Sequence, residues 1–195
     1  MTTEPMTTEP MATEPLSAEP LSAAAPRIHR VRGEDWISHR DLRLSMLAAD
    51  PDAFWADPAQ ERDRDEQQWR AEIAGPRIHL QARRGPETLG GIALLPAGYT
   101  PAHPIPADRA HIVSLWVRPS ARGLGVSRLL FRALARLAVE LGRPDLRLDV
   151  DETNAPARAL YERLGFRATG ERDPREGRDT CWVEYAIRAE QLLEG

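Results

Sequence analysis

The chain has 195 residues, of which 42% are hydrophobic and 29% are charged. This composition fits one globular domain with a substantial core, and no run of about 18 uncharged apolar residues marks a membrane span. The single cysteine, Cys181, excludes an internal disulfide framework and a Cys-based zinc site within one chain. Because the sequence shows no early basic and then apolar segment of the secretory type, we expect a cytoplasmic protein.

The charge is unevenly distributed along the chain. All 26 basic residues are arginine, and the net charge is −4. Four glutamates within residues 1–26, with no basic residue before Arg27, account for this whole excess. The remainder of the chain is neutral and gives no general indication of nucleic-acid or membrane binding. The sequence therefore predicts neither of these partners.

Residues 1–26 form an array of five-residue repeats that begins MTTEP, MTTEP, MATEP, LSAEP. A proline at every fifth position is incompatible with a helix, since proline lacks a donor and clashes with the preceding turn. The repeats also hold too few apolar residues to offset the entropy lost on ordering. We expect residues 1–26 to be a disordered tail and residues 27–195 to form the folded domain. The alternative is an arm that binds a partner or another copy of the chain.

From Arg27 onwards, strand and helix patterns alternate. Period-two alternation predicts strands, apolar residues at helical spacing predict helices, and prolines and glycines mark their ends. In chain order, the sequence predicts strand 27–32, helix 34–49, helix 61–74, strands 78–83 and 88–95, loop 99–108, strand 111–117, a long helix after Gly125 to about Leu141, strand 146–150, a helix after Asn154, and strands 166–170 and 180–188. This order indicates an α/β fold with a mixed sheet rather than a regular doubly wound repeat.

The segment from Arg122 to Ser127 (RGLGVS) lies directly after one strand and opens the long helix. Its two glycines allow a ligand to approach the backbone closely, and the first N–H groups of a helix carry partial positive charge. Together with the Arg122 guanidinium, they predict a phosphate cradle, with a purely structural turn as the alternative. The segment does not fit the dinucleotide-binding fingerprint, because Arg128 stands where a third small residue is needed, and it lacks the Gly-Lys-Ser/Thr of a P-loop.

A second candidate site lies on the helix that follows Asn154. Asn154 and Tyr161 are seven residues apart, which places them two turns apart on one helix face. Asn154 is a suitable N-cap. For Tyr161, the alternative is a core residue whose hydroxyl is satisfied by a neighbour.

Taken together, the strand LWV, the RGLGVS loop and the pattern N-x-x-A-x-x-L-Y-x-x-x-G-F resemble the GNAT superfamily of N-acetyltransferases over about residues 27–190. The resemblance implies a central mixed, mostly antiparallel β-sheet with a splayed pair of strands, flanked by helices. It also implies an enzyme that transfers an acetyl group from acetyl-CoA, as co-substrate and without a metal, to a primary amine of a small molecule, peptide or protein. Dimers are frequent in this family, so a homodimer is an open expectation.

The resemblance also implies which residues contact the cofactor. Backbone groups of one strand would pair with the pantetheine arm, as an added strand would. Asn154 would contact that arm or order the wedge between the splayed strands, and Tyr161 would reach the cofactor sulfur. The pantetheine strand would be Leu115, Trp116 and Val117, and the pyrophosphate would lie against Gly123, Leu124, Gly125, Val126 and Ser127, with Arg122 nearby.

The implied catalytic residue is Tyr161. When a neutral amine attacks a thioester, the tetrahedral intermediate expels a thiolate, and a donor assists that step. Tyrosine is protonated at neutral pH and can donate. No covalent enzyme intermediate is needed, in keeping with the absence of a Gly-x-Ser-x-Gly motif.

The general base is the main departure from the family pattern, in which many members carry a glutamate on the fourth strand. Strand 111–117 contains no carboxylate. His111, the carboxylates Asp149, Asp151 and Glu152, and water all stay open as proton acceptors. The missing carboxylate also motivates an alternative function, a non-catalytic CoA-binding sensor or interaction module. Ser127, where the family has glycine or alanine, is small enough to be a minor departure.

Two further groups of residues carry weaker expectations. Trp36, Trp55 and Trp69 lie where the family builds its acceptor site, but tryptophans at helical spacing more often belong to a core or lid. The histidines lack the close spacing of metal ligands, so the sequence predicts no metal site. They are His29, His39, His79, His103 and His111.

Overall fold

The computed structural model describes residues 25–54, 56–98 and 104–194. Nearly all of the predicted disordered tail lies outside these residues, as do Trp55 and residues 99–103 of the predicted loop. The described remainder of that loop, residues 104–108, contains neither helix nor strand. Among the helices of the described residues, none combines the length and hydrophobicity that crossing a membrane requires.

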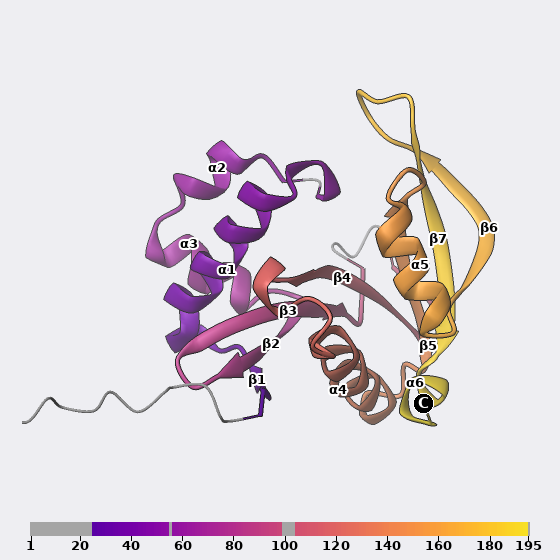
Figure 1. Ribbon diagram of the computed structural model, residues 1–195, viewed down its shortest axis with the longest axis horizontal. Coiled ribbons are helices and arrows are strands. Elements are labelled where there is room, and N and C mark those ends of the chain that lie inside the picture. Colours follow the sequence, from indigo (N-terminus) through magenta and orange to yellow (C-terminus); the bar gives the residue numbers. More distant parts are fainter. Residues whose placement is uncertain (1–24, 55, 99–103, 195) are drawn as a thin grey trace, which may run out of the picture.

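One seven-stranded sheet organises the described part of the chain, in the order β1-β2-β3-β4-β5-β7-β6 (Figure 1). Its strands are β1 Arg27–Arg30, β2 Ile78–Arg84, β3 Glu87–Leu95, β4 Arg109–Val117, β5 Asp145–Asp151, β6 Arg167–Pro174 and β7 Cys181–Arg188. The helices are α1 Trp36–Ala49, α2 Pro58–Arg62, α3 Glu66–Ile73, α4 Val126–Glu140, α5 Ala155–Arg163 and α6 Ala189–Glu194. Only the β4–β5 pair is parallel, which confirms the predicted mixed, mostly antiparallel sheet flanked by helices.

Strands β4 and β5 form the predicted splayed pair. They are paired only where residues 109–111 lie beside residues 145–147. Beyond this point the strands diverge, while β4 stays paired with β3 and β5 stays paired with β7. Figure 1 shows the resulting wedge, with α5 on the β5 side. Among the described strands, one edge of β4 is thus left without a partner along the second half of its length.

A β-bulge at Ser114 divides β4 into two halves. Ser114 has φ 57°, a left-handed conformation that no other described residue except glycine adopts, and the β3–β4 register shifts at this point. Before the bulge, Ala110 and Ile112 pack into the main core, whereas after it Leu115 and Val117 do so. The extra residue therefore shifts the inward-facing positions by one. The same strand presents different faces to the core on either side of Ser114.

The left-handed backbone of Ser114 gives a first testable prediction. A residue with a Cβ pays a steric penalty of about 1–2 kcal/mol in this conformation, whereas glycine does not. We expect Ser114→Gly to leave the free energy of unfolding unchanged or raise it by up to about 1 kcal/mol. Val113→Gly, one residue earlier in ordinary strand geometry, should lower it. Urea unfolding of both variants checks this, and a clear destabilisation by Ser114→Gly would contradict it.

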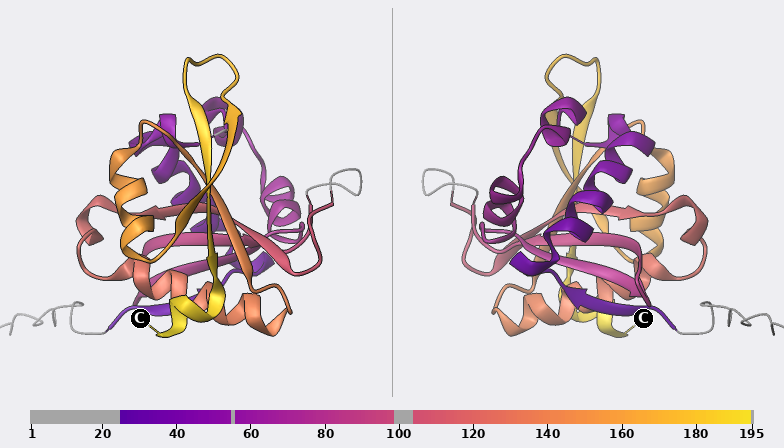
Figure 2. Two further views of the ribbon diagram at one scale, coloured as in Figure 1. Left: turned by 90° about the vertical axis from the view of Figure 1, so that its right-hand side faces the viewer. Right: turned by 90° about the vertical axis from the view of Figure 1, so that its left-hand side faces the viewer.

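Two hydrophobic clusters hold the helices on opposite faces of the sheet (Figure 2). The larger cluster contains the buried face of α4, with Leu130, Phe131 and Leu134 fully inaccessible. This face follows the predicted 3.6-residue period. The smaller cluster joins α1 to β4 through Leu42, Met46, Leu47 and Trp116. Helices α4 and α1 therefore flank the two faces of the strand that borders the wedge.

The structure corrects the predicted elements in three places. The single helix predicted over 61–74 is wrong, because two helices, α2 and α3, occupy this region. The break is encoded by Asp65, which accepts a hydrogen bond from the Gln68 N–H in a capping box and so starts a new helix. The short C-terminal helix α6, which buries Leu192, was not predicted. Strand β6 continues to Pro174, beyond the predicted end at Gly170.

Candidate active site

The predicted phosphate loop is an exposed turn between β4 and α4. Gly123 and Gly125 both have φ +78°, a conformation that favours glycine, and a Cβ added at either position would meet no atom within 4 Å. Gly125 is the N-cap of α4, and no side chain caps this helix. Within the described part of the chain, no side-chain cap therefore serves the first N–H groups of α4. This arrangement suits an anionic ligand.

Arg122 is held beside this loop by two hydrogen bonds. Its Nε donates to the carbonyl of Val117 at 3.0 Å, and its Nη2 donates to Asp50 Oδ2 at 2.8 Å. The same Asp50 oxygen accepts from Trp116 Nε1 at 2.7 Å. Asp50 ends α1, so one carboxylate connects α1 to both β4 and the loop. This contact was not predicted, because nothing near Asp50 in the sequence indicates it.

The strand segment Leu115–Val117 lies on the β4 half that has no β5 partner. Its other edge is paired with β3, where Val117 lies opposite Gly90 and Trp116 opposite Gly91. The Trp116 side chain is buried against α1. The backbone groups that face the wedge are thus available to pair with an extended ligand.

Helix α5 carries the second pair of predicted residues. Asn154 caps the helix, since its Oδ1 accepts from the Ala157 N–H at 3.2 Å. Tyr161 is buried, and its ring lies 6.2 Å from that of Phe131 on α4 and 5.8 Å from that of Phe166. Burial raises the pKa of Tyr161 to about 12, so the hydroxyl is protonated at neutral pH. Among the described residues, no hydrogen-bond partner occupies this hydroxyl. The structure thus brings Tyr161 next to α4 with a free donor.

Two titratable residues lie near the point where the two strands of the wedge separate. His111 is the last residue of β4 that pairs with β5, and Asp149 lies two residues beyond its partner, Arg147. Desolvation lowers the pKa of His111, and the charge of Asp149 partly opposes this. Desolvation likewise raises the pKa of Asp149, opposed by His111. His111 is therefore favoured in the neutral form that can accept a proton, and the charge of Asp149 favours the imidazolium that would form. Pairs of this kind are candidates for proton transfer.

The other two candidate bases, Asp151 and Glu152, are engaged in the protein's own hydrogen bonds. Asp151 is buried, pairs with Arg175 and accepts hydrogen bonds from Thr153 and Thr180. Glu152 pairs with Arg172 and accepts from the backbone N–H of Cys181. These contacts give both carboxylates a structural role, in fastening the β6–β7 turn to the end of β5.

The Asp151–Arg175 pair gives a second prediction. Breaking a buried ion pair on one side leaves an uncompensated charge, so we expect Asp151→Asn to lower the free energy of unfolding by about 3 kcal/mol. Arg178→Met, which removes an exposed pair with Asp52, should cost less than about 1 kcal/mol. Equal losses in urea unfolding would contradict the prediction.

The same pair makes stability depend on pH. Hydrogen bonds from Thr153, Arg175 and Thr180 outweigh burial and lower the pKa of Asp151. A carboxyl with a lowered folded-state pKa stabilises the fold above its unfolded value of about 3.9, and this stabilisation is lost as the pH falls below it. We therefore expect the stability difference between the parent and Asp151→Asn to shrink below about pH 4. Urea unfolding at pH 7 and pH 3 checks this.

The described tryptophans differ in their surroundings. Trp69 is fully buried, 5.9 Å edge-on from the ring of His39, and is a core residue. Trp36 is partly exposed beneath the guanidinium of Arg40, whose central carbon lies 5.3 Å from the centroid of the Trp36 ring.

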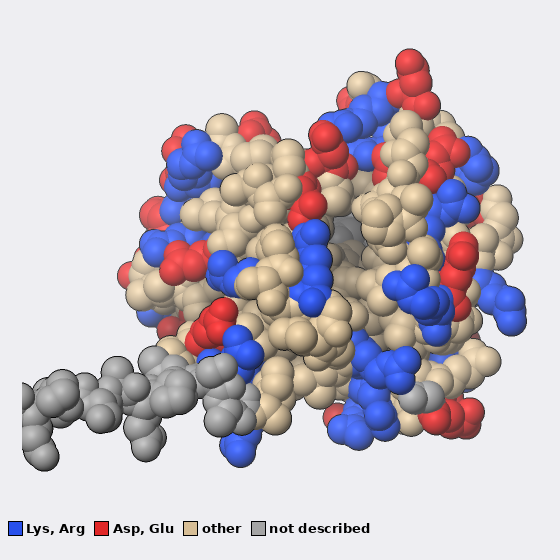
Figure 3. Space-filling view, in the orientation of Figure 1, with Lys and Arg blue, Asp and Glu red and all other residues tan. Residues whose placement is uncertain are grey.

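Figure 3 shows the surface hollowed between the side formed by α1–α3 and the side formed by α5 and β7.

Comparison with known proteins places this architecture in a family. A family model described as "Acetyltransferase (GNAT) family" matches residues 44–166, more than half of the chain. The chain belongs to the GNAT family. The match includes β4, the glycine loop and α5, so this GNAT chain carries the family pattern across the whole wedge.

Curated relatives of this GNAT chain match over shorter stretches. A mycothiol acetyltransferase from Salinispora tropica is 37% identical over 140 residues, covering 64% of this chain and 44% of the relative. A streptothricin acetyltransferase from Streptomyces lavendulae is 42% identical over 63 residues, covering 32% of this chain and 33% of the relative. The chain thus spans less than half of the length of these relatives.

Solved structures show the same fold over most of the chain. A putative acetyltransferase from Salmonella typhimurium, solved with its cofactor acetyl-CoA, matches with a TM-score of 0.64 and 16% identity, covering 85% of this chain and 95% of that one. A GCN5-related N-acetyltransferase from Kribbella flavida matches with a TM-score of 0.64 and 21% identity, covering 84% and 98%. At these identities the likeness establishes the GNAT fold.

Proposed function

We propose that this protein transfers an acetyl group from acetyl-CoA directly to a primary amine of a small molecule, peptide or protein. The observation that carries the proposal is the unpaired edge of β4 beyond His111, close in sequence to the uncapped start of α4. An extended pantetheine arm needs the first feature and a pyrophosphate needs the second. Family membership supports the same cofactor.

In this proposal, the cofactor lies along the wedge. Backbone groups of Leu115–Val117 pair with the pantetheine arm, and the amides of Gly123–Ser127 hold the pyrophosphate beside Arg122. Asn154 keeps the start of α5 in place through its cap. These roles use main-chain groups almost throughout, so they depend on backbone shape more than on side-chain identity.

The reaction then follows from the groups that border the wedge. A neutral amine attacks the thioester carbonyl, whose oxygen is polarised by a main-chain N–H of β4 such as that of Leu115. The tetrahedral intermediate collapses, the C–S bond breaks, and Tyr161 donates its proton to the departing thiolate. Its unpartnered, protonated hydroxyl supports this role.

The proton of the amine is assigned to the pair His111 and Asp149. A neutral imidazole accepts a proton, and a carboxylate on the neighbouring strand stabilises the imidazolium that forms. We expect His111→Gln to lower kcat by about 10²-fold or more, with unchanged affinity for acetyl-CoA. His29→Gln is the control, because His29 lies on the edge strand β1, away from β4 and β5. There it hydrogen-bonds Asp35 at 2.8 Å. Equal kcat in both variants, measured as thiol release, would show that water rather than His111 accepts the proton.

The first experiment is a calorimetric titration of acetyl-CoA into the full chain, followed by an acceptor screen that measures free thiol. The panel should include amine-bearing small molecules, a lysine peptide and a peptide with an N-terminal alanine. Relatives named for streptothricin, peptidyl-lysine and ribosomal-protein alanine acetylation justify this range. Thiol release that requires one acceptor class supports the proposal, whereas no binding by the folded protein refutes it.

A non-catalytic CoA-binding module is the second candidate, because β4 carries no carboxylate. Tight binding of acetyl-CoA without thiol release across the panel would favour this function. A higher affinity for a longer acyl-CoA would redirect the same screen towards another acyl donor.

A further inference from the structure

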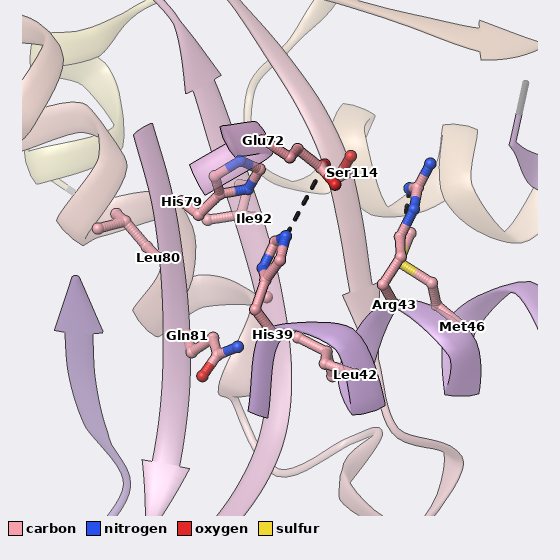
Figure 4. Close-up of a pocket in the computed structure, with 11 residues that line it drawn as sticks. His39, Leu42, Arg43, Met46, Glu72, His79, Leu80, Gln81, Ile92 and Ser114 are labelled. Atoms are coloured by element: carbon pink, nitrogen blue, oxygen red, sulfur yellow. Dashed lines mark hydrogen bonds and ion pairs between the residues drawn. The ribbon is translucent and has the colours of Figure 1, made fainter. Parts of the chain in front are cut away.

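A buried cluster of three metal-ligating side chains lies between α1, α3 and β2, apart from the residues that border the wedge. His39 comes from α1, Glu72 from α3 and His79 from β2. One ligand atom from each lies within 4.8 Å of the other two. Figure 4 shows that the three side chains point towards one another from their separate elements. Both histidines are less than one-tenth exposed.

One ring nitrogen of each histidine in this cluster is not satisfied by the described residues. The Nε2 atoms of both His39 and His79 are buried without a hydrogen-bond partner among the described residues. The distance from His39 Nε2 to Glu72 Oε1 is 3.8 Å, which is too long for a hydrogen bond. An unsatisfied buried polar atom costs about 1–3 kcal/mol, and an ion is one of its ordinary explanations.

The spacing of the ligand atoms is close to that of a metal site. Ligands on bonds of about 2.1 Å lie at most about 4.2 Å apart. The observed limit of 4.8 Å needs only small movements of flexible side chains to reach this value. Two imidazole nitrogens and one carboxylate oxygen make up a donor set typical of divalent zinc and its neighbours among the transition metals.

A neighbouring arginine holds the carboxylate of this cluster in place. Arg64 Nη1 donates to Glu72 Oε2 at 2.6 Å and so fixes the carboxylate from its other oxygen. Outer-shell contacts of this kind orient metal ligands.

We propose that His39, Glu72 and His79 bind one divalent transition-metal ion, zinc being the best suited. The three residues border a hollow that is also lined by Leu42 and Ser114, so a fourth ligand can come from water or a small molecule. Arg64 and Arg77 beside Glu72 oppose an added cation, and we therefore expect weaker binding than at a structural zinc site. The sequence did not indicate this site because its histidines are far apart in the chain and meet only through the packing of α1 on β2.

The test is metal binding by the full chain after removal of metals with a chelator. Zinc is titrated by calorimetry, and cobalt is added as a spectroscopic probe of the coordination. We expect one ion per chain, with affinity reduced at least about tenfold in His39→Gln, His79→Gln and Glu72→Gln, the lower bound for losing even an outer-shell contact. His29→Gln and Glu66→Gln are the matched controls, since His29 lies on β1 and Glu66, on the same helix as Glu72, pairs with Arg70 outside the ligand set.

Circular dichroism verifies that each variant is folded before its affinity is compared. If a ligand variant does not fold, metal binding by the parent protein tests the proposal. Visible cobalt bands of a four-coordinate nitrogen–oxygen site, together with a zinc-dependent rise in melting temperature, support the proposal. No binding by the folded parent, or affinity that is unchanged in folded His39→Gln and His79→Gln, would overturn it. Neither readout depends on acetyl transfer.

Discussion

Gly125→Glu is expected to weaken acetyl-CoA binding at least tenfold, which corresponds to about 1.4 kcal/mol. The substitution places a carboxylate at the N-cap of α4, where we propose that the amides receive the pyrophosphate. Like charges repel, and the added side chain occupies space that is open in the parent. Calorimetric titration of acetyl-CoA measures the loss.

The matched control is Gly142→Glu at the other end of the same helix. Gly142 also has a positive φ, +68°, and open space around a Cβ, so both variants carry similar backbone strain and the same added charge. A glutamate is favourable near the N-terminus of a helix and unfavourable near its C-terminus. Gly142→Glu should therefore be the less stable variant and yet bind acetyl-CoA as the parent does. Equal affinities in the two variants would refute the cradle at Gly125.

Tyr161→Phe is expected to lower kcat by about 10²–10⁴-fold while leaving acetyl-CoA affinity unchanged. The variant loses only the hydroxyl that we propose as donor to the thiolate. Because this hydroxyl has no partner among the described residues, its removal should not lower the melting temperature. Single-turnover thiol release isolates the chemical step.

Tyr185→Phe provides the opposite control within the same aromatic cluster. The two rings lie 6.2 Å apart, but the Tyr185 hydroxyl accepts from Arg158 Nε at 3.2 Å and donates to Glu162 Oε1 at 3.0 Å. We expect this variant to lose about 1 kcal/mol of stability and to keep its turnover. Parent-like turnover in Tyr161→Phe, with the chemical step limiting, would show that the general-acid assignment is wrong.

Much of the fold was predictable because it depends on local patterns. The stripe of α4 and the strand alternation around it follow directly from residue spacing. The splayed, mostly antiparallel sheet was instead implied by the resemblance to the GNAT family, and it is confirmed. The break between α2 and α3 was also encoded locally, in the Asp65–Gln68 capping box, but charged residues on both sides masked it. Helix α6 escaped notice because six residues are too few to show a period.

The contacts around the candidate sites were less predictable because they join distant parts of the chain. The glycine loop is a local motif, and its positive φ values follow from its composition. By contrast, Asp50 meets Arg122 across 72 positions of sequence, and Arg175 meets Asp151 across 24. Such pairs form only after distant elements have packed together, and a single sequence carries no record of that packing.

The single carboxylate of Asp50 has a thermodynamic consequence for the proposed reaction. It holds Arg122 and Trp116 at once, and so links the end of α1 to the loop that would receive the cofactor. A pyrophosphate that binds Arg122 must compete with Asp50 for this guanidinium. Losing the Arg122–Asp50 pair would weaken the contact between the loop and the end of α1. Linkage is reciprocal. If an acceptor that shifts α1 changes the affinity for the cofactor, then the cofactor changes the affinity for that acceptor by the same factor. The two substrates would then bind with coupled rather than independent affinities.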